Sequence, residues 1–287
     1  MRRSLALLLI LSLLPGCEKA GFAIANLPSA FANGGVTTGV AYGPQPWQKL
    51  DIYVPPSPGN RQLDTIVFFY GGRWTTGSRE DYRFVGQMFA DKGFITVIPD
   101  YSKYPAVRFP AFVEDGARAL AWVHDHISGY HGDPRKIHVA GHSAGAHIGA
   151  LLSADPHYLA AYHKSTQEVI ASFAGLAGPY DFVPDEPDLV DMFGPPVRFP
   201  KMQVPTFITG HEPPMLLLWG AEDTTVRRYN LDKLQSAIES KSGQVRTIIY
   251  PGTDHVNIVA ALSWLNPARA PVADDMVRFF KDVDRHR

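Results

Sequence analysis

The sequence has one cysteine, no apolar run of membrane-spanning length and no excess of charge of either sign. Its 287 residues include 27 Lys and Arg against 28 Asp and Glu, for a formal net charge of −1. A chain with this balance and no basic stripe is a poor candidate for nucleic-acid binding. The single cysteine, Cys17, excludes an internal disulfide. The longest apolar run, Leu5–Leu14, is about half of the roughly 20 residues that a spanning helix needs.

The composition gives no sign of a disordered chain, and the motifs give no sign of a metal site. Hydrophobic residues make up 45% of the chain and charged residues 19%, which is the composition of an ordinary globular core. Clusters of His, Cys and carboxylates at metal-ligand spacing are missing, so we predict neither a metal site nor a cofactor.

The N-terminus has the pattern of an export signal. Met1–Arg3 is positively charged and is followed by the short apolar run Leu5–Leu14. We therefore predict a signal peptide over residues 1–16. The ending before Cys17 resembles a bacterial lipoprotein box, which implies a lipidated cysteine and a protein held at the periplasmic face of a membrane. The alternative is cleavage at Ala23-Ile24-Ala25 or Ala30-Phe31-Ala32, which would give a soluble periplasmic or secreted protein.

The order of the remaining segments predicts one α/β domain. Residues 17–35 are mostly small and suggest a tether, and the folded domain is expected over 36–287. Strands are predicted at 49–54, 65–70, 94–98, 136–140, 169–173, 215–219 and 245–250, and helices at 78–91, 110–131, after Ser143, 226–241 and 272–283. Strands that alternate with helices indicate a mostly parallel, doubly wound sheet with helices on both faces.

One segment departs from this alternation. Residues 176–214 are rich in proline and contain no long periodic stretch. A segment of this length between two core strands is typical of a functional element. We therefore predict a lid-like insertion or a pocket wall there.

The most informative motif is Gly-His-Ser-Ala-Gly at residues 141–145, directly after an apolar strand. A serine between two such glycines, where a strand turns sharply into a helix, is a candidate nucleophile. The turn also directs the first helical N–H groups, and the positive end of the helix dipole, at whatever Ser143 attacks. Because the motif occurs often by chance, the rest of the chain has to support it.

A serine nucleophile needs a base and an acid that orients the base. Asp223 follows the predicted strand that ends at Trp219, and His255 follows the one that ends at Tyr250. This is the chain order Ser, Asp, His that the chemistry uses on such a sheet. Glu222 is the alternative acid, whereas Asp254 is expected to shape the loop beside His255.

An upstream loop could supply the remaining requirement, an oxyanion hole. Tyr70-Gly71-Gly72-Arg73-Trp74 follows a buried strand, and paired glycines let backbone N–H groups approach a developing negative charge. A plain Gly-Gly turn is the alternative, but its position upstream of the serine motif favours the functional interpretation.

With these motifs, residues from about 36 to 285 resemble the α/β-hydrolase carboxylesterases related to hormone-sensitive lipase. More narrowly they resemble the bacterial esterase, feruloyl esterase-like and kynurenine formamidase-like branch. The resemblance implies a sheet of about eight strands. It assigns the nucleophile to Ser143, the acid to Asp223 and the base to His255.

The same resemblance assigns the oxyanion donors to the backbone N–H groups of Gly72, Arg73 and Ala144. One position departs from the family pattern, because Tyr70 stands where the family has a histidine that helps to hold this loop. The departure leaves the anchoring of the loop open without removing its backbone donors.

The expected activity is hydrolysis of small carboxylic esters through an acyl-enzyme. Two alternatives stay open: an arylformamidase, and an inactive hydrolase fold that serves as a binding module of the envelope. Trp74, Phe182 and Phe193 fit either an apolar acyl or aryl pocket or the packed core.

Overall fold

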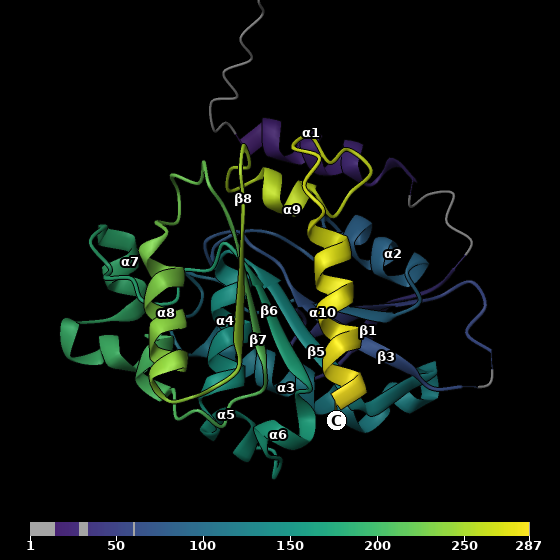
Figure 1. Cartoon of the computed structure of the whole chain (residues 1–287), viewed down its shortest axis with the longest axis horizontal. Helices are drawn as coiled ribbons and strands as arrows, with labels where there is room; N and C mark the ends of the chain where they lie inside the picture. Colours follow the sequence, from purple (N-terminus) through teal and green to yellow (C-terminus); the bar gives the residue numbers. More distant parts are fainter. Residues whose placement is uncertain (1–14, 29–33, 60, 287) are drawn as a thin grey trace, which may run out of the picture.

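The computed structural model describes residues 15–28, 34–59 and 61–286. Its centre is an eight-stranded sheet in the order β1-β2-β4-β3-β5-β6-β7-β8 (Figure 1). The strands are β1 (Gly35–Ala41), β2 (Lys49–Val54), β3 (Leu63–Phe69), β4 (Ile95–Pro99), β5 (Gly132–His142), β6 (Ser172–Leu176), β7 (Met215–Gly220) and β8 (Val245–Tyr250). The pairs β1–β2 and β2–β4 are antiparallel, and the remaining neighbours are parallel.

Helices cover both faces of this sheet. The longer ones are α1 (Pro15–Ala25), α2 (Arg83–Asp91), α3 (Ala111–His126), α4 (Ala144–Ala154), α8 (Tyr229–Ser240) and α10 (Val272–His286). The rings of Phe89 in α2 and Phe280 in α10 approach to 6.5 Å, so these two helices share one face. Helices α3 and α4 pack together on the other face, behind the sheet in Figure 1.

The middle strands explain why the sheet is parallel. Every residue of β6 and of β7 is buried, as expected for strands covered by helices on both sides. The short apolar runs of the sequence therefore become the core. The doubly wound α/β architecture with eight strands agrees with the prediction.

Local differences from the predicted elements have identifiable causes. Strand β1 was not predicted, and β6 begins three residues later than the predicted 169–173. The late start of β6 is explained by a capping box between Ser165 and Glu168. It starts the short helix α6 (Thr166–Val169) and holds these residues out of the strand. The first predicted helix, at 78–91, starts only at Arg83.

The predicted tether at 17–35 needs correction. Residues up to Ala25 form α1, Ala25 is buried, and the backbone carbonyl of Ile24 accepts a hydrogen bond from Trp264 at 3.2 Å. The helix is therefore docked on the domain. The predicted signal peptide lies almost entirely outside the described residues, as do the second cleavage site and the side chain of Cys17. None of the helices in the described residues is long and apolar enough to cross a membrane.

The predicted insertion at 176–214 contains short helices. They are α7 (Pro187–Phe193) and the 3₁₀ helices η3 (Pro196–Lys201) and η4 (Val204–Phe207). The segment joins β6 to β7 and therefore starts at the carboxyl edge of the sheet, where ligands bind in open α/β folds. Three other short helices are α5 (His157–Ala160), α9 (Asn257–Ala260) and η2 (Ile127–Tyr130).

Candidate active site

Ser143 occupies a strained turn between β5 and α4. Its backbone has φ 52° and ψ −120°, a conformation that a residue with a side chain rarely adopts. The Ser143 N–H donates to the carbonyl of Leu176 at 2.9 Å, which ties the turn to the neighbouring strand β6. Strain of this kind persists where the surrounding structure holds it, and it is typical of functional sites.

The two flanking glycines are required by close backbone contacts. A Cβ on Gly141 would lie 2.5 Å from the backbone of Gly145. A Cβ on Gly145 would lie 2.0 Å from the carbonyl oxygen of Phe69 in β3. Neither position can hold another residue without moving the backbone.

Three side chains from different loops form a hydrogen-bonded chain. His255 Nε2 lies 3.0 Å from Ser143 Oγ, and His255 Nδ1 lies 2.7 Å from Asp223 Oδ2. The second oxygen of Asp223 accepts from the N–H groups of Thr225 and Val226 at 2.8 and 2.9 Å. The buried carboxylate is therefore fixed on both oxygens, and it can orient the ring of His255.

The two neighbouring acids have other positions. Glu222, the alternative acid, is exposed. Asp254 accepts hydrogen bonds from the backbone of Val256 and Asn257 at 3.0 and 2.8 Å, and so shapes the turn into α9. The structure thus places Asp223, and not Glu222, against His255.

His142 makes a contact that the sequence analysis did not predict. Its Nε2 lies 2.9 Å from the backbone carbonyl of His255, and the two rings approach to 4.8 Å. Burial, together with the nearby ring of His255, lowers the pKa of His142 to about 3. The ring is therefore neutral, and because a carbonyl only accepts, Nε2 carries the proton. Its place next to the nucleophile in sequence was the one signal for this role.

The Gly-Gly loop lies against the same turn. A Cβ on Gly71 would lie 3.3 Å from Ser143 Cβ and 2.8 Å from His142 Nδ1. Gly72 has φ 124°, and a Cβ there would lie 2.4 Å from the carbonyl oxygen of Thr76. The backbone of the loop therefore lies directly beside the turn that carries Ser143. Arg73 continues the unusual course of the loop with φ 53°.

Tyr70 resolves the open question of how this loop is anchored. Its buried hydroxyl donates to Asp100 Oδ1 at 2.7 Å and accepts from Lys103 Nζ at 2.9 Å. Asp100 also accepts the backbone N–H of Arg79 at 2.8 Å, at the far end of the loop. The guanidinium of Arg79 pairs with Asp100 and with Asp51 at 2.5 and 2.8 Å. A buried charge network therefore joins both ends of the loop without a histidine.

The 176–214 insertion contacts the other side of the loop through ion pairs. Arg73 binds Asp188 at 2.7 Å and Glu186 at 2.6 Å, at the start of α7. Arg108 binds Asp191 of the same helix at 2.7 Å. All of these side chains are at least one-third exposed.

Aromatic packing completes this contact. Trp74 stacks on Phe182 at 5.6 Å and meets Phe193 edge-on at 4.9 Å. Trp74 and Phe193 are 4% and 2% exposed, so they form a packed wall. Behind them, His147 of α4 holds the carbonyl of Met202 at 2.7 Å, and burial lowers the pKa of His147 to about 4.

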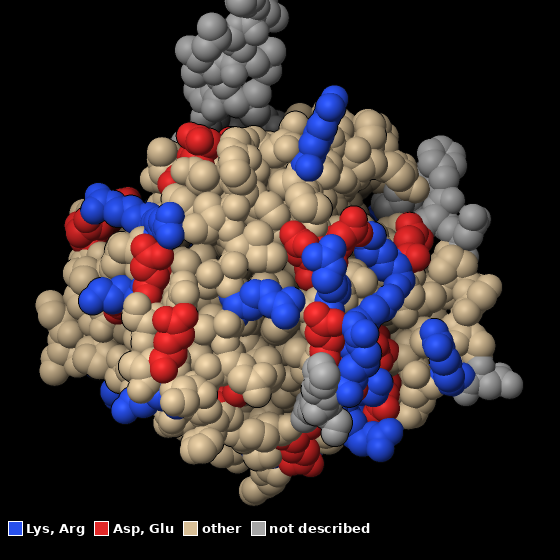
Figure 2. Space-filling view, viewed as in Figure 1, with Lys and Arg blue, Asp and Glu red and all other residues tan. Residues whose placement is uncertain are grey.

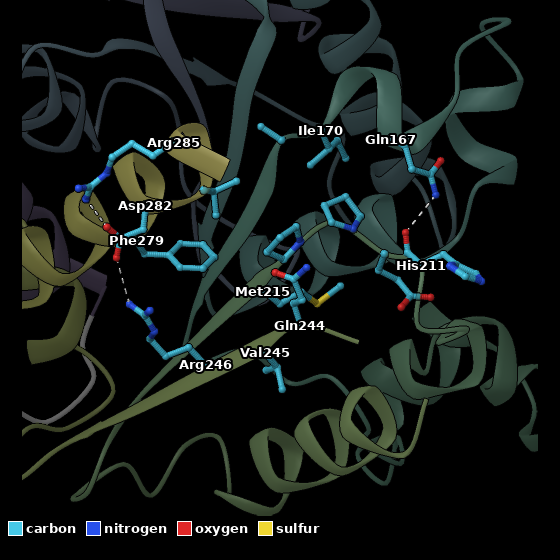
Figure 3. A pocket seen from close by; sticks show the side chains of 15 residues that line it. Gln167, Ile170, His211, Met215, Gln244, Val245, Arg246, Phe279, Asp282 and Arg285 are labelled. Atoms are coloured by element: carbon cyan, nitrogen blue, oxygen red, sulfur yellow. Dashed lines mark hydrogen bonds and ion pairs between the residues drawn. The ribbon is translucent and has the colours of Figure 1, made fainter. Parts of the chain in front are cut away.

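A groove of about 680 Å³ lies at the opposite edge of the sheet (Figure 3). It is lined by the starts of β7 and β8, including Met215 and Val245, and by Phe279 and Asp282 of α10. Parallel strands place their chemistry at the carboxyl edge, so this groove is remote from Ser143. In the ranges that the structure describes, no group of three His, Cys, Asp or Glu is arranged to hold a metal ion.

The sequence model of the BD-FAE family matches residues 50–238, about two-thirds of the chain. Among curated proteins, the chain is 28% identical over 272 residues to Esterase LipC of Mycobacterium tuberculosis, covering 86% of this chain and 65% of that protein. It is 26% identical over 252 residues to isoprenylcysteine alpha-carbonyl methylesterase ICME of Arabidopsis thaliana, covering 80% of this chain and 58% of that protein. The chain therefore spans about three-fifths of the length of these relatives.

Solved structures show the same fold. Esterase B of Lactobacillus rhamnosis superposes with a TM-score of 0.79 at 20% identity, covering 94% of this chain and 93% of that one. Thermogutta terrifontis esterase 2 superposes with a TM-score of 0.73 at 22% identity, covering 88% and 95%. The predicted α/β-hydrolase fold is confirmed.

Proposed function

The chain belongs to the BD-FAE family, and from that premise we propose that it is a serine carboxylesterase that works through an acyl-enzyme. The observation that carries the proposal is the hydrogen-bonded chain from Ser143 through His255 to Asp223, at 3.0 and 2.7 Å. The names of the relatives support the same class of reaction, since they describe esterases.

In the proposed mechanism His255 Nε2 takes the proton from Ser143 Oγ as that oxygen bonds to the ester carbonyl carbon. Asp223 fixes the tautomer, because its carboxylate accepts a hydrogen bond from the Nδ1–H of His255 and stabilises the imidazolium that forms. The C–O bond to the alcohol then breaks, and His255 returns the proton to the leaving oxygen. A water molecule, activated by the same His255, releases the acid and restores Ser143.

The developing oxyanion is expected to bind the backbone N–H groups of Gly72, Arg73 and Ala144. Two features support this assignment: the close approach of the Gly-Gly loop to Ser143, and the position of Ala144 as the first residue of α4. Loss of one such donor costs about 3 kcal/mol of transition-state stabilisation. The inner position of the loop is maintained by Tyr70 and Asp100.

Ser143→Ala tests the nucleophile. We expect kcat/KM for p-nitrophenyl esters to fall by at least about a thousandfold, because the residues of a triad act as a unit. Ser153→Ala is the matched control, since Ser153 is also buried on α4 but bonds only the carbonyl of Gly149. Full activity in Ser143→Ala, with the circular dichroism spectrum unchanged, would overturn the proposal.

A fluorophosphonate probe separates the enzyme from an inactive hydrolase fold. The probe should label the wild-type chain on Ser143 and leave Ser143→Ala unlabelled. A panel of p-nitrophenyl esters of increasing acyl length, a feruloyl ester and an aryl formamide then distinguishes an esterase from an arylformamidase by the highest kcat/KM.

For location, we propose export and lipidation of Cys17 at the periplasmic face of a membrane. The sequence pattern Met1–Arg3, Leu5–Leu14 and Cys17 supports this. Wild-type chain should fractionate with membranes and carry a lipidated N-terminal peptide by mass spectrometry. Cys17→Ser should lose both properties, and an unmodified peptide starting at residue 26 or 33 would favour the soluble alternative.

A further inference from the structure

Helix α1 exposes apolar side chains on its outer surface. Its inner side carries Ala25, which is buried, and Phe22, whose ring lies 5.0 Å from that of Tyr82. Ile24 of the helix is 46% exposed, and Leu27, two residues beyond the end of the helix, is 59% exposed. A surface helix normally directs its polar side chains to water. An apolar outer face therefore points to a partner.

The helix is fixed in this orientation from two sides. The side-chain amide of Asn26 donates to the carbonyl of Asp81 at 2.9 Å and accepts from the N–H of Phe84 at 2.8 Å. From the other side, the indole N–H of Trp264 donates to the carbonyl of Ile24 at 3.2 Å. The helix thus bridges the segment after the Gly-Gly loop and the segment after His255.

The second of these segments extends the apolar surface. Trp264 is 59% exposed, Leu265 38% and Val256 65%. We call the five exposed residues the apolar face: Ile24, Leu27, Val256, Trp264 and Leu265. They come from α1, from the turn that follows it and from the segment that includes α9; α1 and α9 lie at the same end of the molecule in Figure 1.

The two segments carry few charges. Residues 15–28 contain one acidic residue, Glu18, and one basic residue, Lys19, while the one charged residue of 256–270 is Arg269. In the space-filling view this end shows few charged side chains, whereas red and blue side chains gather over α10 (Figure 2). An apolar surface with so few charges can enter the headgroup region of a bilayer without removing many charged side chains from water.

We propose that the apolar face docks on a phospholipid bilayer. The argument for this occupant over a second protein is continuity in the chain: Cys17, the proposed site of lipidation, lies within α1. Trp264 adds an amphipathic ring of the kind that is enriched at the headgroup level of membranes. Anchor and face would then hold the domain in one orientation rather than leave it on a free tether.

Docking in this orientation has a consequence for substrate choice, which rests on the proposed function. Val256 belongs to the apolar face and directly follows His255, so the triad end of the sheet would face the lipid. Esters with long acyl chains partition into the same bilayer. The substrate class that fits this geometry is a membrane-partitioned ester rather than a freely soluble one.

Vesicle binding tests the docking without any turnover, so its outcome is independent of the esterase proposal. The mature chain, which starts at residue 17 and carries Cys17→Ser so that it cannot be lipidated, is mixed with vesicles of phosphatidylethanolamine and phosphatidylglycerol in equal parts. Adding Leu27→Ser and Leu265→Ser should lower the partition coefficient at least about tenfold, because two leucines lose their apolar burial. Val183→Ser with Val197→Ser is the matched control and should bind as the parent does, since these valines are 59% and 83% exposed outside the face.

Quenching by lipids with brominated acyl chains gives the second measurement. Trp264 should be quenched in the parent, and Trp264→Phe should bind equally while losing that quenching. Equal binding by the Leu27/Leu265 variant together with unquenched Trp264 would overturn the proposal. A shift from dimer to monomer in that variant, with no change in vesicle binding, would assign the face to a second copy and overturn it as well.

Discussion

The two walls beside Ser143 are held by ion pairs of opposite character. The inner wall, residues 70–79, is anchored by Arg79, Asp51 and Asp100, whose side chains are 15%, 0% and 11% exposed. The outer wall, helix α7, is tied by pairs such as Arg73 with Asp188, at 44% and 36% exposed. Buried pairs are screened little by salt, while exposed pairs contribute about 1 kcal/mol or less.

The difference assigns a separate task to each wall. The Gly-Gly backbone that faces Ser143 belongs to the inner wall, where a shift of an ångström would misplace the oxyanion donors. The outer wall packs aromatic side chains over that loop, and because its ion pairs are exposed and weak we expect it to move more readily than the inner wall. We therefore expect mutations of the inner wall to change stability and catalysis, and mutations of the outer wall to change substrate range.

The largest effect is expected where the inner wall meets the nucleophile. In Gly145→Ala the new methyl group would lie 2.0 Å from the carbonyl oxygen of Phe69 and 2.5 Å from that of Tyr70. Because backbone has to move, we expect a loss of more than about 4 kcal/mol in the free energy of unfolding. Urea denaturation measures it. Gly129→Ala, where a Cβ meets nothing within 4 Å, is the control and should change stability by about 0.5 kcal/mol or less.

Removing one acid from each wall compares the walls directly. Asp100→Ala leaves Arg79 and the Tyr70 hydroxyl without the carboxylate that they share, and should cost about 3–5 kcal/mol. Asp191→Ala in α7 breaks an exposed pair with Arg108, so the free energy of unfolding should change much less than in Asp100→Ala. Both values come from urea denaturation at neutral pH. Similar losses in the two variants would contradict the distinction between the walls.

Each wall also rests on a neutral histidine, which makes both sensitive to acid. The pKa values of His142 and His147 are lowered to about 3 and about 4, against about 6.5 in the unfolded chain. Below about pH 6.5 the unfolded chain therefore binds protons that the folded chain does not. Each histidine should remove about 1.4 kcal/mol of stability per pH unit as the pH falls towards its folded pKa.

Glutamine substitutions isolate this effect, because a side-chain amide keeps a donor without a titrating ring. His142→Gln and His147→Gln should each flatten the fall in unfolding free energy between pH 6 and pH 5, measured in urea. A slope equal to that of the wild-type chain in both variants would show that neither ring stays neutral. If only His147→Gln flattened the slope, the outer wall would be the acid-sensitive one.

The smallest effect is expected for Arg73→Gln, which leaves the backbone of the loop in place. The variant loses the pairs with Glu186 and Asp188, for about 1 kcal/mol or less, and a rise in salt should produce the same change in the wild-type chain. Hydrogen exchange over residues 187–193 should speed up, while exchange over β5 should not. Equal protection of α7 in both proteins would indicate that aromatic packing alone holds it.

Sequence patterns predicted the features that depend on neighbours in the chain. Buried strand runs gave the parallel sheet, and the glycines around Ser143 indicated the turn that the structure shows. The contacts missed join residues that are far apart: Asn26 with Phe84, His142 with the carbonyl of His255, and Arg79 with Asp51. Such pairs are set by tertiary packing, which cannot be predicted from the periodicity of apolar residues along the sequence. The tether prediction was wrong for the same reason, since small residues that look unstructured alone form α1 against the domain.

The position of β8 determines the order in which the site assembles and fails. This strand is the outermost of the parallel set, its side chains are only partly buried, and its carboxyl end carries the loop of His255. Ser143 sits on the central strand β5, which is surrounded by packed neighbours on both sides. Edge strands open at lower free energy than central ones. Because residue 143 precedes residue 255, the nucleophile is synthesised before its base. On heating, we expect the β8 edge to open first and to displace His255, so that hydrolysis stops while most of the fold is intact.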